Sequence, residues 1–552
     1  MRLYRVTSLK EKFLFCFLIL FFISSLSYWL VSSYYSKTES IANFGGEYIE
    51  GNIGQPAHIN PVLSLSNDVD SDLSLIIYNG LLKYNDKGAL INDLTESYEI
   101  NEDKTVYTFH LKKNVTWHDG EKLTADDVFF TFNLISDPAY KSPLRSIWQG
   151  VSANIVDEYT ISFKTSPYVG FLNNATFGIM PKHIWEPVKP ENFALTELNL
   201  EPIGTGPFKY TSFQKDSKGN ILSYKLVANP NYFYGKPYLS KITFNFYTEE
   251  SALLDAYNRK EIMGINSVSS QNISTIKNQK NTFVHELNIP RYFAVFINQI
   301  KSVPLADDKV REALNYATNR EELINLLLDG KGTPVYSPIL PGMLGYSPDL
   351  GKVNYDSEKA KKLLDEAGWK TSGDGIRVKD DKLLEINLVT TNWDEFNKLA
   401  EILKAQWEKV GVKVNINSPT VSDVQQNYIR PREYEALLFG QNIGADPDPY
   451  SFWHFSQGKD PGLNLAIFGD DTSDKLIEAG RMEFDPEKRA QNYVDFQNIL
   501  IKEIPAIFLC SPKYIYPVNK SIQGMTTENI ASPAKRFSNI EKWYIKTKRI
   551  WK

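Results

Sequence analysis

An uncharged stretch near the N-terminus constrains this chain more than any other feature of its sequence. Residues 13–36 carry no charged side chain and are bracketed by Lys12 and Lys37. As a helix rising about 1.5 Å per residue, the stretch is long enough to cross the hydrocarbon core of a bilayer. Basic residues precede it, so the positive-inside rule places residues 1–12 in the cytoplasm and the chain from about residue 40 onward outside. The sequence therefore predicts a transmembrane anchor.

A cleaved signal peptide is the alternative interpretation of the same stretch. Ser24, Ser25 and Ser27 would permit cleavage, but the apolar region of a signal peptide is usually shorter and ends in small residues. Cys16 lies too early and follows Phe-Leu-Phe, so a lipid anchor is not expected. We predict an uncleaved helix, with four aromatic residues at the position of an interfacial belt: Tyr28, Trp29, Tyr34 and Tyr35.

The size and charge of the chain limit its architecture and partners. Its 552 residues exceed what a single hydrophobic core supports, so we expect two or three lobes. The net charge is −5, and residues 1–40 contribute +3, which leaves −8 for the remainder. An acidic body without a long basic run lacks the electrostatic footprint of nucleic-acid binding. Only two cysteines are present, Cys16 and Cys510, and no disulfide is expected between them.

Local patterns in the first half predict a strand, a turn and a helix. Thr105–Leu111 alternates apolar and polar residues as a half-buried strand does, and the turn residues Trp117–Gly120 follow, so a hairpin is expected. Thr124 and Asp127 have the spacing of a capping box and lead into an amphipathic run. A helix should begin there.

The second half alternates helical patterns with short β-rich runs. Apolar residues recur at helical spacing throughout Asp307–Leu328, which predicts a helix ending at Asp329-Gly330. Asp356 should cap a second helix that ends at Gly368. A third is expected over about Trp393–Val410, followed by a strand over Val412–Ile416. Helices closed by glycine and followed by strands are typical of α/β layers.

The sequence contains no recognisable motif for metal, nucleotide or nucleophilic chemistry. The six histidines are scattered, with no pair four residues apart and no cluster with cysteine, so no metal site is expected. There is no nucleotide-binding glycine loop and no nucleophile elbow. Neighbouring acids such as Asp126-Asp127 are interpreted as charges at helix starts or in loops. The sequence predicts no catalytic activity and no cofactor.

Six segments, in order along the chain, resemble the family 5 extracellular solute-binding proteins of ABC importers, which include dipeptide, oligopeptide and nickel receptors. The longest reads DLTESYEINEDKTVYTFHLKKNVTWHDGEKLTADDVFFTF. Together the matches are distributed over roughly residues 45–540. The segments are residues 93–132, 202–208, 229–238, 310–316, 355–369 and 446–450.

The resemblance implies an α/β fold of periplasmic-binding-protein type (type II), with two lobes and three domains that close around a ligand by a hinge. The transmembrane helix would precede it. The implied domains are lobe one (domain I) from residues 44–75, 200–290 and 510–552, the small domain II of lobe one from 76–199, and lobe two (domain III) from 291–509.

The resemblance also implies a function. Such a receptor captures peptides at the extracytoplasmic face of the membrane, in the periplasm or at the cell surface, and delivers them to permease subunits served by separate ATPase subunits. We expect a monomer that does not bind nucleic acid. The alternatives are a non-peptide ligand, such as an oligosaccharide or a nickel chelate, a sensor or chaperone without a transport role, and a surface hydrolase that borrows the fold.

The ligand-binding loop departs from the pattern of its peptide-binding relatives. In those relatives a lobe-two loop carries Trp followed three residues later by Asp, which pairs with the peptide α-ammonium. Here Ala445 occupies the Asp position, and Gln441 or Asn442 stands in the Trp position. Asp446 is the nearest acid and Asp448 the next, and either could hold an amine if the loop shifts.

Further candidates adjoin this loop and lie at the start of lobe one. Tyr450, Trp453 and His454 follow the loop and offer stacking faces, although Trp453 could equally pack inside lobe two. A Gly/Pro-punctuated segment follows the predicted strand Glu47–Glu50, in a region whose backbone lies near the ligand in the relatives. Its candidate cleft residues are Gln55, His58 and Asn60.

Overall fold

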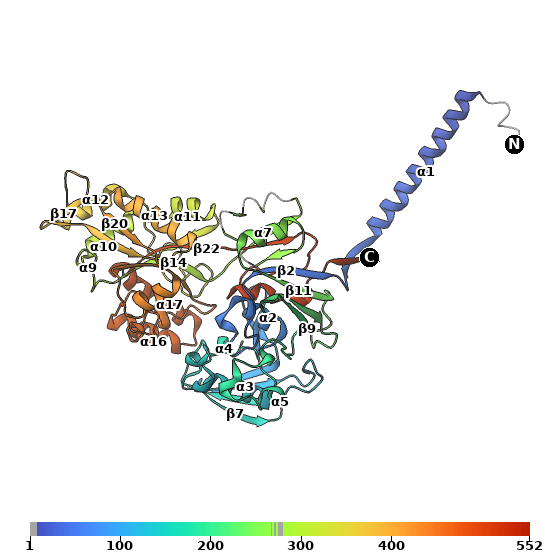
Figure 1. The fold of residues 1–552 in the computed structure, drawn as a ribbon, viewed down its shortest axis with the longest axis horizontal. Coiled ribbons are helices and arrows are strands. Elements are labelled where there is room, and N and C mark those ends of the chain that lie inside the picture. The colour runs from blue at the N-terminus through green and yellow to red at the C-terminus, as the bar shows by residue number, and fades with distance from the viewer. Residues whose placement is uncertain (1–7, 267, 270–271, 274–275, 277–279) are drawn as a thin grey trace.

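The computed structural model describes residues 8–266, 268–269, 272–273, 276 and 280–552, so residues 1–7 of the predicted cytoplasmic segment lie outside the described residues. A 29-residue helix, α1 (Leu9–Lys37), projects away from two lobes (Figure 1). Ser8 caps it in a reciprocal box with Glu11, and none of its side chains is buried. An 18-residue window of α1 has a mean hydropathy of 2.3, so the helix is long and apolar enough to span a membrane.

The C-terminal end of the chain pairs with the segment that leaves α1. β1 (Thr38–Asn43) and β24 (Lys546–Trp551) form an antiparallel ribbon that joins positions more than 500 residues apart. Trp551 meets the ring of Tyr34 edge to face at 5.9 Å. The ribbon therefore lies at the base of α1 (Figure 1).

Lobe one is built on a seven-stranded mixed sheet with the order β13-β23-β12-β2-β11-β10-β9. β2 lies at its centre and runs parallel to both neighbours, β11 and β12. Helix α2 (Asp68–Ile77) packs against the C-terminal turn η8 (Pro533–Phe537). The remaining elements are β2 (Glu47–Ile53), β9 (Phe208–Lys215), β10 (Ile221–Ala228), β11 (Lys241–Tyr247), β12 (Gly264–Ile265), β13 (Thr282–Leu287), β23 (Tyr514–Asn519), η2 (Ser64–Ser66), α7 (Glu250–Asn258) and η9 (Ile540–Lys542).

A smaller four-stranded antiparallel sheet has the order β5-β6-β8-β7 and lies below the seven-stranded sheet in Figure 1. The two sheets share one hydrophobic core. The smaller sheet lies within residues 76–199, although the exact limits of the three domains stay predictions. Its elements are β3 (Leu82–Tyr84), β4 (Leu90–Asn92), β5 (Thr95–Ile100), β6 (Val106–Leu111), α3 (Ala125–Ser136), η3 (Pro138–Tyr140), η4 (Arg145–Trp148), β7 (Ser152–Asp157), β8 (Thr160–Lys164), α4 (Phe171–Asn174), α5 (Lys182–Trp185), α6 (Pro190–Phe193) and η5 (Glu197–Asn199).

The turn Gly204-Thr-Gly-Pro207, which lies within the family-like segment 202–208, packs directly against the end of α2. A Cβ atom on Gly204 would lie 1.9 Å from the carbonyl oxygen of Ile77, and one on Gly206 would lie 2.3 Å from that of Ile76. Only glycine permits so close a backbone approach. The motif therefore has a packing role in this chain.

Lobe two is a six-stranded mixed sheet with the order β15-β22-β14-β21-β19-β20, covered by helices on both faces. Its elements are β14 (Arg291–Ile297), α9 (Val303–Ala306), α10 (Asp308–Ala317), α11 (Arg320–Leu328), β15 (Gly332–Pro334), α12 (Ser357–Glu366), β16 (Lys370–Thr371), β17 (Arg377–Lys379), β18 (Lys382–Leu383), β19 (Glu385–Val389), α13 (Asp394–Glu408), β20 (Lys413–Asn417), α14 (Val421–Asp423), η6 (Val424–Ile429), β21 (Ala436–Asn442), α15 (Tyr450–Trp453), η7 (Phe455–Gln457), α16 (Asp471–Met482), α17 (Pro486–Glu503) and β22 (Ala506–Pro512).

Strand β14 shows why this sheet is buried on both faces. Side chains alternate along a strand, and Phe293 and Val295 enter one hydrophobic cluster while Tyr292 and Phe296 enter the other. The strand is consequently apolar at almost every position, as expected for a sheet covered by helices on both sides. Its first residue, Arg291, is the exception.

Several local predictions are confirmed. Thr124 and Asp127 form the capping box that begins α3, and the Asp356 side chain caps α12 by accepting the Lys359 N–H. Gly411 adopts a φ of 88° after α13, where the predicted third helix ends. The α/β prediction for the second half is confirmed as well.

Two local predictions are wrong in detail. The predicted single helix over Asp307–Leu328 is divided into α10 and α11, because the Asn319 side chain accepts the Glu322 N–H and starts a new helix. The expected hairpin after Thr105–Leu111 is reduced to one bridge between Thr116 and Lys122, since β6 pairs with β5 and β8 instead.

Candidate functional site

The chain crosses between the lobes twice. β13 of lobe one leads into β14 of lobe two through residues 288–290, and β22 of lobe two returns to β23 through Lys513. The Lys513 ammonium donates to the side chain of Asn288, so the two crossovers touch. A pair of short adjacent connections is the usual structure of a hinge between lobes.

A cavity of about 670 Å³ lies beside these crossovers, within the size range of small-ligand sites. Both lobes line it. Lobe one contributes Ile53, Asp68, Asp72, Glu250, Asn266, Val268, Ser269, Ile273, Tyr514, Ile515, Pro533 and Arg536. Lobe two contributes Arg291, Leu327, Leu328, Lys331, Trp393, Asp394, Glu395, Lys398 and Pro512, and Lys513 comes from a crossover. We refer to this cavity as the interlobe cleft.

Two charged groups of lobe two lie in the cleft without an ion-pair partner among the residues that the structure describes. Arg291 begins β14, and its buried Nε has no hydrogen-bond partner there. Glu395 lies in the first turn of α13, where burial raises the pKa of its carboxyl and the nearby Arg291 lowers it. A buried charged group without a partner is costly, so both side chains are suited to an incoming ligand.

Two of the exposed charges in the cleft lie on opposite lobes. Asp68 begins α2 on lobe one, and Lys398 lies on α13 of lobe two. The cleft thus presents anions on both lobes, Asp68 and Glu395, together with the cations Arg291 and Lys398 on lobe two. This arrangement is complementary to a ligand that carries both an ammonium and a carboxylate.

Apolar groups in the cleft provide contact area beside these charges. Trp393, the residue before α13, is 58% exposed, and its ring lies 6.3 Å from that of Phe396. Ile53 at the end of β2 is 39% exposed. An indole held at a cleft wall offers a flat face for stacking and a polar N–H.

The lobe-one wall of the cleft rests on a buried ion triad. Arg536 donates to Glu50 at 3.0 Å and to Asp72 at 2.5 Å, and all three side chains are at most 1% exposed. Burial raises the pKa of both carboxyls, and Arg536 opposes that rise. The Tyr516 hydroxyl also donates to Glu50, at 2.9 Å. The three charges are thus paired with one another, and only the Nε of Arg536 has no hydrogen-bond partner among the described residues.

The two acids predicted to hold a ligand amine are ion-paired within the protein. Arg489 donates to Asp446 at 2.7 Å, and Asn173 of lobe one donates to the same carboxylate at 3.3 Å. Arg481 pairs with Asp448 at 3.0 Å. A ligand ammonium could reach either carboxylate only by displacing a guanidinium, and neither acid lines the interlobe cleft.

The aromatic candidates after this loop pack inside lobe two. Trp453 is 1% exposed and contacts the ring of Phe508 at 5.6 Å. Tyr450 stacks on His454 at 4.3 Å, and the imidazole Nε2 lies 3.2 Å from Glu478. Their side chains are therefore engaged with neighbouring residues of the lobe.

Gln441 and Asn442 end β21 and take part in local hydrogen bonds. Gln441 is 5% exposed, accepts from the Tyr292 hydroxyl and donates to the Leu463 carbonyl at 3.1 Å. The Asn442 side chain accepts the Gly444 N–H at 3.3 Å, and its backbone is paired with Arg291. Asn442 is thus next to the cleft through its backbone.

The candidates after β2 lie away from the cleft cavity. Gln55 accepts the Ile221 N–H at 2.7 Å, and His58 Nε2 lies 3.1 Å from the Ala194 carbonyl oxygen. Asn60 is fully buried, and its side-chain oxygen accepts the N–H groups of Val62 and Leu63. None of the ten predicted site residues lines the interlobe cleft, and their roles in binding stay predictions.

Sequence reasoning missed Arg291, Trp393 and Glu395. The sequence did contain one indication of Arg291. This residue directly precedes six consecutive hydrophobic residues, and no residue near it in the sequence explains a charge at that position. Trp393 and Glu395 looked like ordinary residues at a helix start. Only the approach of the two lobes distinguishes them.

Two smaller cavities lie elsewhere in the molecule. One of about 440 Å³ lies near the crossovers and includes Ala445, Tyr84 and Met343 in its lining. The other, of about 230 Å³, lies in lobe one. Among the described residues, no group of three or more His, Cys, Asp or Glu side chains could hold a metal ion.

Comparison with known proteins places the chain among solute-binding proteins. Residues 89–462 match the profile described as bacterial extracellular solute-binding proteins, family 5 Middle. The oligopeptide-binding protein AppA of Bacillus subtilis is 30% identical over 511 residues, which cover 91% of this chain and 92% of AppA.

Solved structures show the same architecture. AppA of Bacillus subtilis in complex with a nonapeptide superposes with a TM-score of 0.74 at 29% identity, covering 92% of this chain and 100% of that one. NikZ of Campylobacter jejuni in complex with Ni(L-His) gives 0.76 at 26% identity, covering 90% and 99%. The predicted two-lobe fold of periplasmic-binding-protein type is confirmed.

Proposed function

Because this chain belongs to the bacterial extracellular solute-binding proteins of family 5, we propose that it captures peptides outside the membrane and delivers them to the permease of an ABC importer. The family assignment confirms the resemblance that the sequence motifs indicated. Members of this family are binding proteins, and we propose that this chain likewise has no catalytic activity of its own.

One observation carries the peptide assignment: the interlobe cleft holds unpaired charges of both signs beside an exposed indole. A peptide brings an α-ammonium and an α-carboxylate, and its backbone amides can stack over Trp393. We assign the ammonium to Glu395 or Asp68 and the carboxylate to Arg291. Closure of the lobes would bury these pairs and increase their value for specificity.

The proposal includes an anchored receptor. α1 would cross the membrane with its N-terminus in the cytoplasm, and the ribbon of β1 and β24 would lie at the outer surface. ATP hydrolysis would belong to separate subunits that act on the permease. We expect the receptor itself to work as a monomer.

Thermal unfolding of the full chain in lipid nanodiscs tests the ligand class. The panel contains peptides of two to nine residues, oligosaccharides, and the nickel–histidine complex. A ligand at about 100 times its dissociation constant should stabilise the fold by about 2.7 kcal/mol. We expect a rise in unfolding temperature with peptides that is weakened in Arg291→Met. No rise with any peptide at millimolar concentration would sink the peptide assignment.

A non-peptide ligand is the alternative with an observation of its own, the likeness to NikZ bound to Ni(L-His). A rise with the nickel complex or an oligosaccharide alone would keep the receptor role and replace the ligand. A sensor or chaperone role predicts that peptide uptake by cells is unchanged when the gene is deleted. Loss of uptake on deletion and recovery with the intact chain would exclude that role.

A further inference from the structure

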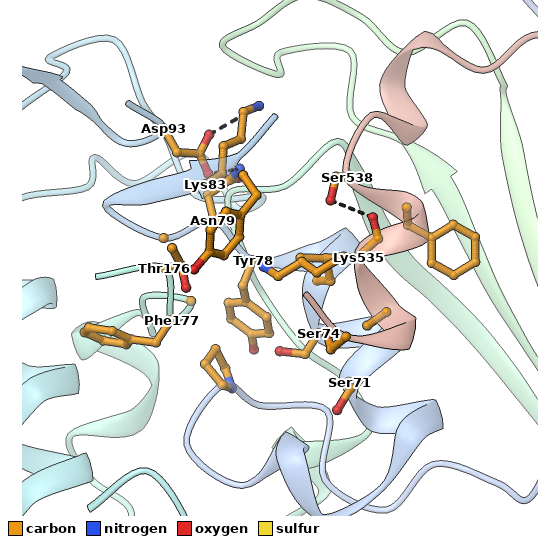
Figure 2. A pocket seen from close by; sticks show the side chains of 18 of the residues that line it. Ser71, Ser74, Tyr78, Asn79, Lys83, Asp93, Thr176, Phe177, Lys535 and Ser538 are labelled. Atoms are coloured by element: carbon orange, nitrogen blue, oxygen red, sulfur yellow. Dashed lines mark hydrogen bonds and ion pairs between the residues drawn. The ribbon is translucent and has the colours of Figure 1, made fainter. Parts of the chain in front are cut away.

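Lobe one contains a pocket of about 230 Å³ whose lining residues take no part in the proposed peptide contacts. It lies between α2, the segment from Tyr78 to Tyr84, and the C-terminal turn η8 (Figure 2). Its wall is apolar for the larger part, through residues such as Leu75 and Phe177. Several polar groups nevertheless point into it.

Lys535 is the first of these groups. Its side chain extends from η8 into the pocket (Figure 2) and makes no hydrogen bond or ion pair within the part of the chain that the structure describes. The ammonium lies 5.8 Å from the centre of the Tyr84 ring. Burial lowers the pKa of Lys535 to about 8, and Asp93 opposes the decrease, so the group remains a cation at neutral pH.

The Tyr78 hydroxyl is the second group. The side chain is 3% exposed, and its hydroxyl has no hydrogen-bond partner among the described residues. Ser74 lies one helical turn earlier on α2, and Figure 2 shows both hydroxyls directed toward the same space. A buried hydroxyl left without a partner is disfavoured, which a ligand acceptor atom would correct.

The acids of the pocket form no ion pair with Lys535 among the described residues. Asp93 accepts from Asn79 at 2.9 Å, and its other oxygen lies 3.6 Å from the ammonium of Lys83. Glu541 also lines the pocket, and burial raises the pKa of its carboxyl. Lys535 and Tyr78 are therefore left as a cation and a donor directed into one small space.

The pocket borders the space between the lobes. Tyr84 lines both this pocket and the cavity near the crossovers, and Asn173, also in the lining, donates to Asp446 of lobe two at 3.3 Å. A group carried by a ligand between the lobes is thus within reach of it.

We propose that this pocket binds a carboxylate group, with Lys535 as its counterion and the Tyr78 and Ser74 hydroxyls as hydrogen-bond donors. The carboxylate comes from an acidic side chain of the ligand in the cleft, an assignment that rests on the proposed function, or from a separate small carboxylic acid. In the first case the receptor prefers acidic peptides.

Isothermal titration of the full chain in nanodiscs tests the pocket. Peptides that differ only by Glu or Gln at one position are compared, with each position varied in turn, and benzoate and propionate are titrated separately. In the wild type, one Glu peptide should bind about tenfold more tightly than its Gln partner, as expected for a charged hydrogen bond. Lys535→Met should remove that difference and leave the Gln peptide unaffected.

Two further variants keep the test sharp. Tyr78→Phe retains the ring and should reduce the Glu preference severalfold, whereas Lys542→Met, an exposed lysine of the same C-terminal segment, should retain it. Equal affinities for all Glu and Gln pairs in the wild type, with no binding of benzoate or propionate, would overturn the proposal. So would a preference that survives in Lys535→Met.

Titrations with benzoate and propionate show whether the carboxylate belongs to the transported ligand or to a separate acid. They also test the pocket independently of the proposed peptide function. Binding of benzoate or propionate that is lost in Lys535→Met supports the pocket even when no peptide binds, in which case only the peptide function fails. A Glu preference without binding of the free acids places the carboxylate on the transported ligand.

Discussion

Two groups of charges lie near the space between the lobes and differ in what they are bonded to. In the loop after β21, Asp446 and Asp448 are each held by an arginine, at 2.7 and 3.0 Å. In the interlobe cleft, Arg291 and Glu395 have no such partner among the described residues. A charge that is already paired must break that pair before it binds a ligand, whereas an unpaired charge gains by binding one.

The comparison predicts that the largest loss of stability comes from breaking an ion pair in the loop after β21. Arg489 is 6% exposed and also donates to the Gly480 carbonyl at 3.0 Å. Arg489→Met should lower the free energy of unfolding by about 3–5 kcal/mol, because it leaves the Asp446 carboxylate buried without its partner. Urea unfolding followed by tryptophan fluorescence measures the shift, with the exposed Arg430→Met as control. A loss below about 1 kcal/mol would show that the pair is already solvated.

Removing an unpaired charge of the interlobe cleft should affect peptide binding more than stability. Arg291→Met should weaken peptide affinity by about tenfold to hundredfold, the loss of a charged hydrogen bond worth about 1.5–3 kcal/mol. Stability should hold or rise, since the buried Nε of Arg291 has no partner in the unliganded protein. Titration calorimetry and unfolding on the same sample measure both. Unchanged affinity would remove Arg291 from the site.

Asp446→Asn distinguishes the sequence-based prediction from the cleft assignment. If Asp446 is an internal partner of Arg489, the variant loses about 1–2 kcal/mol of stability and keeps peptide affinity within about twofold. If Asp446 holds the ligand ammonium, affinity falls about tenfold or more. The same titration with Asp448→Asn provides the matched comparison.

The smallest expected effect is a pH dependence at Glu395. Burial raises the pKa of this carboxyl, although Arg291 opposes the rise, so protonation on acidification begins at a higher pH than for an exposed glutamate. Affinity for a ligand ammonium should therefore fall severalfold as the pH decreases through that pKa. The unliganded protein should gain stability over the same range, because ionisation of a buried acid disfavours the folded state.

Glu395→Gln is the control for this pH effect. It should remove both trends, leaving only the contributions of the other charges in the cleft, which are Asp68, Asp72, Glu250, Arg291, Lys331, Asp394, Lys398, Lys513 and Arg536. Identical pH profiles for the variant and the wild type would assign the dependence to another group.

Structural features that depend on residues close together in the sequence could be predicted from the sequence. The apolar run of α1, the capping box of Thr124 and the helix of α13 depend on side chains within a few positions of one another, and each was located from sequence. The break at Asn319 was missed because continuous apolar spacing concealed a residue whose side chain starts a new helix. The family motifs likewise reside in short segments.

The candidate site could not be predicted in the same way. Asp446 and Asp448 have the sequence context of ligand-binding acids, yet their partners Arg489 and Arg481 come from α17 and α16, more than 30 residues away. In the cleft, Arg291 lies near Glu395 because β14 passes beside the start of α13, although 104 positions separate them in the sequence.

The sequence by itself determined the long apolar helix α1, the α/β class and the family. The tertiary structure decided which charges are satisfied and which are left for a ligand. The physical reason is range. Helix periodicity and caps act over one or two turns, whereas pairing between charges depends on distances that exist only after each lobe has folded. The same holds for the pairing of β1 with β24 and for the isolation of Lys535 in its pocket.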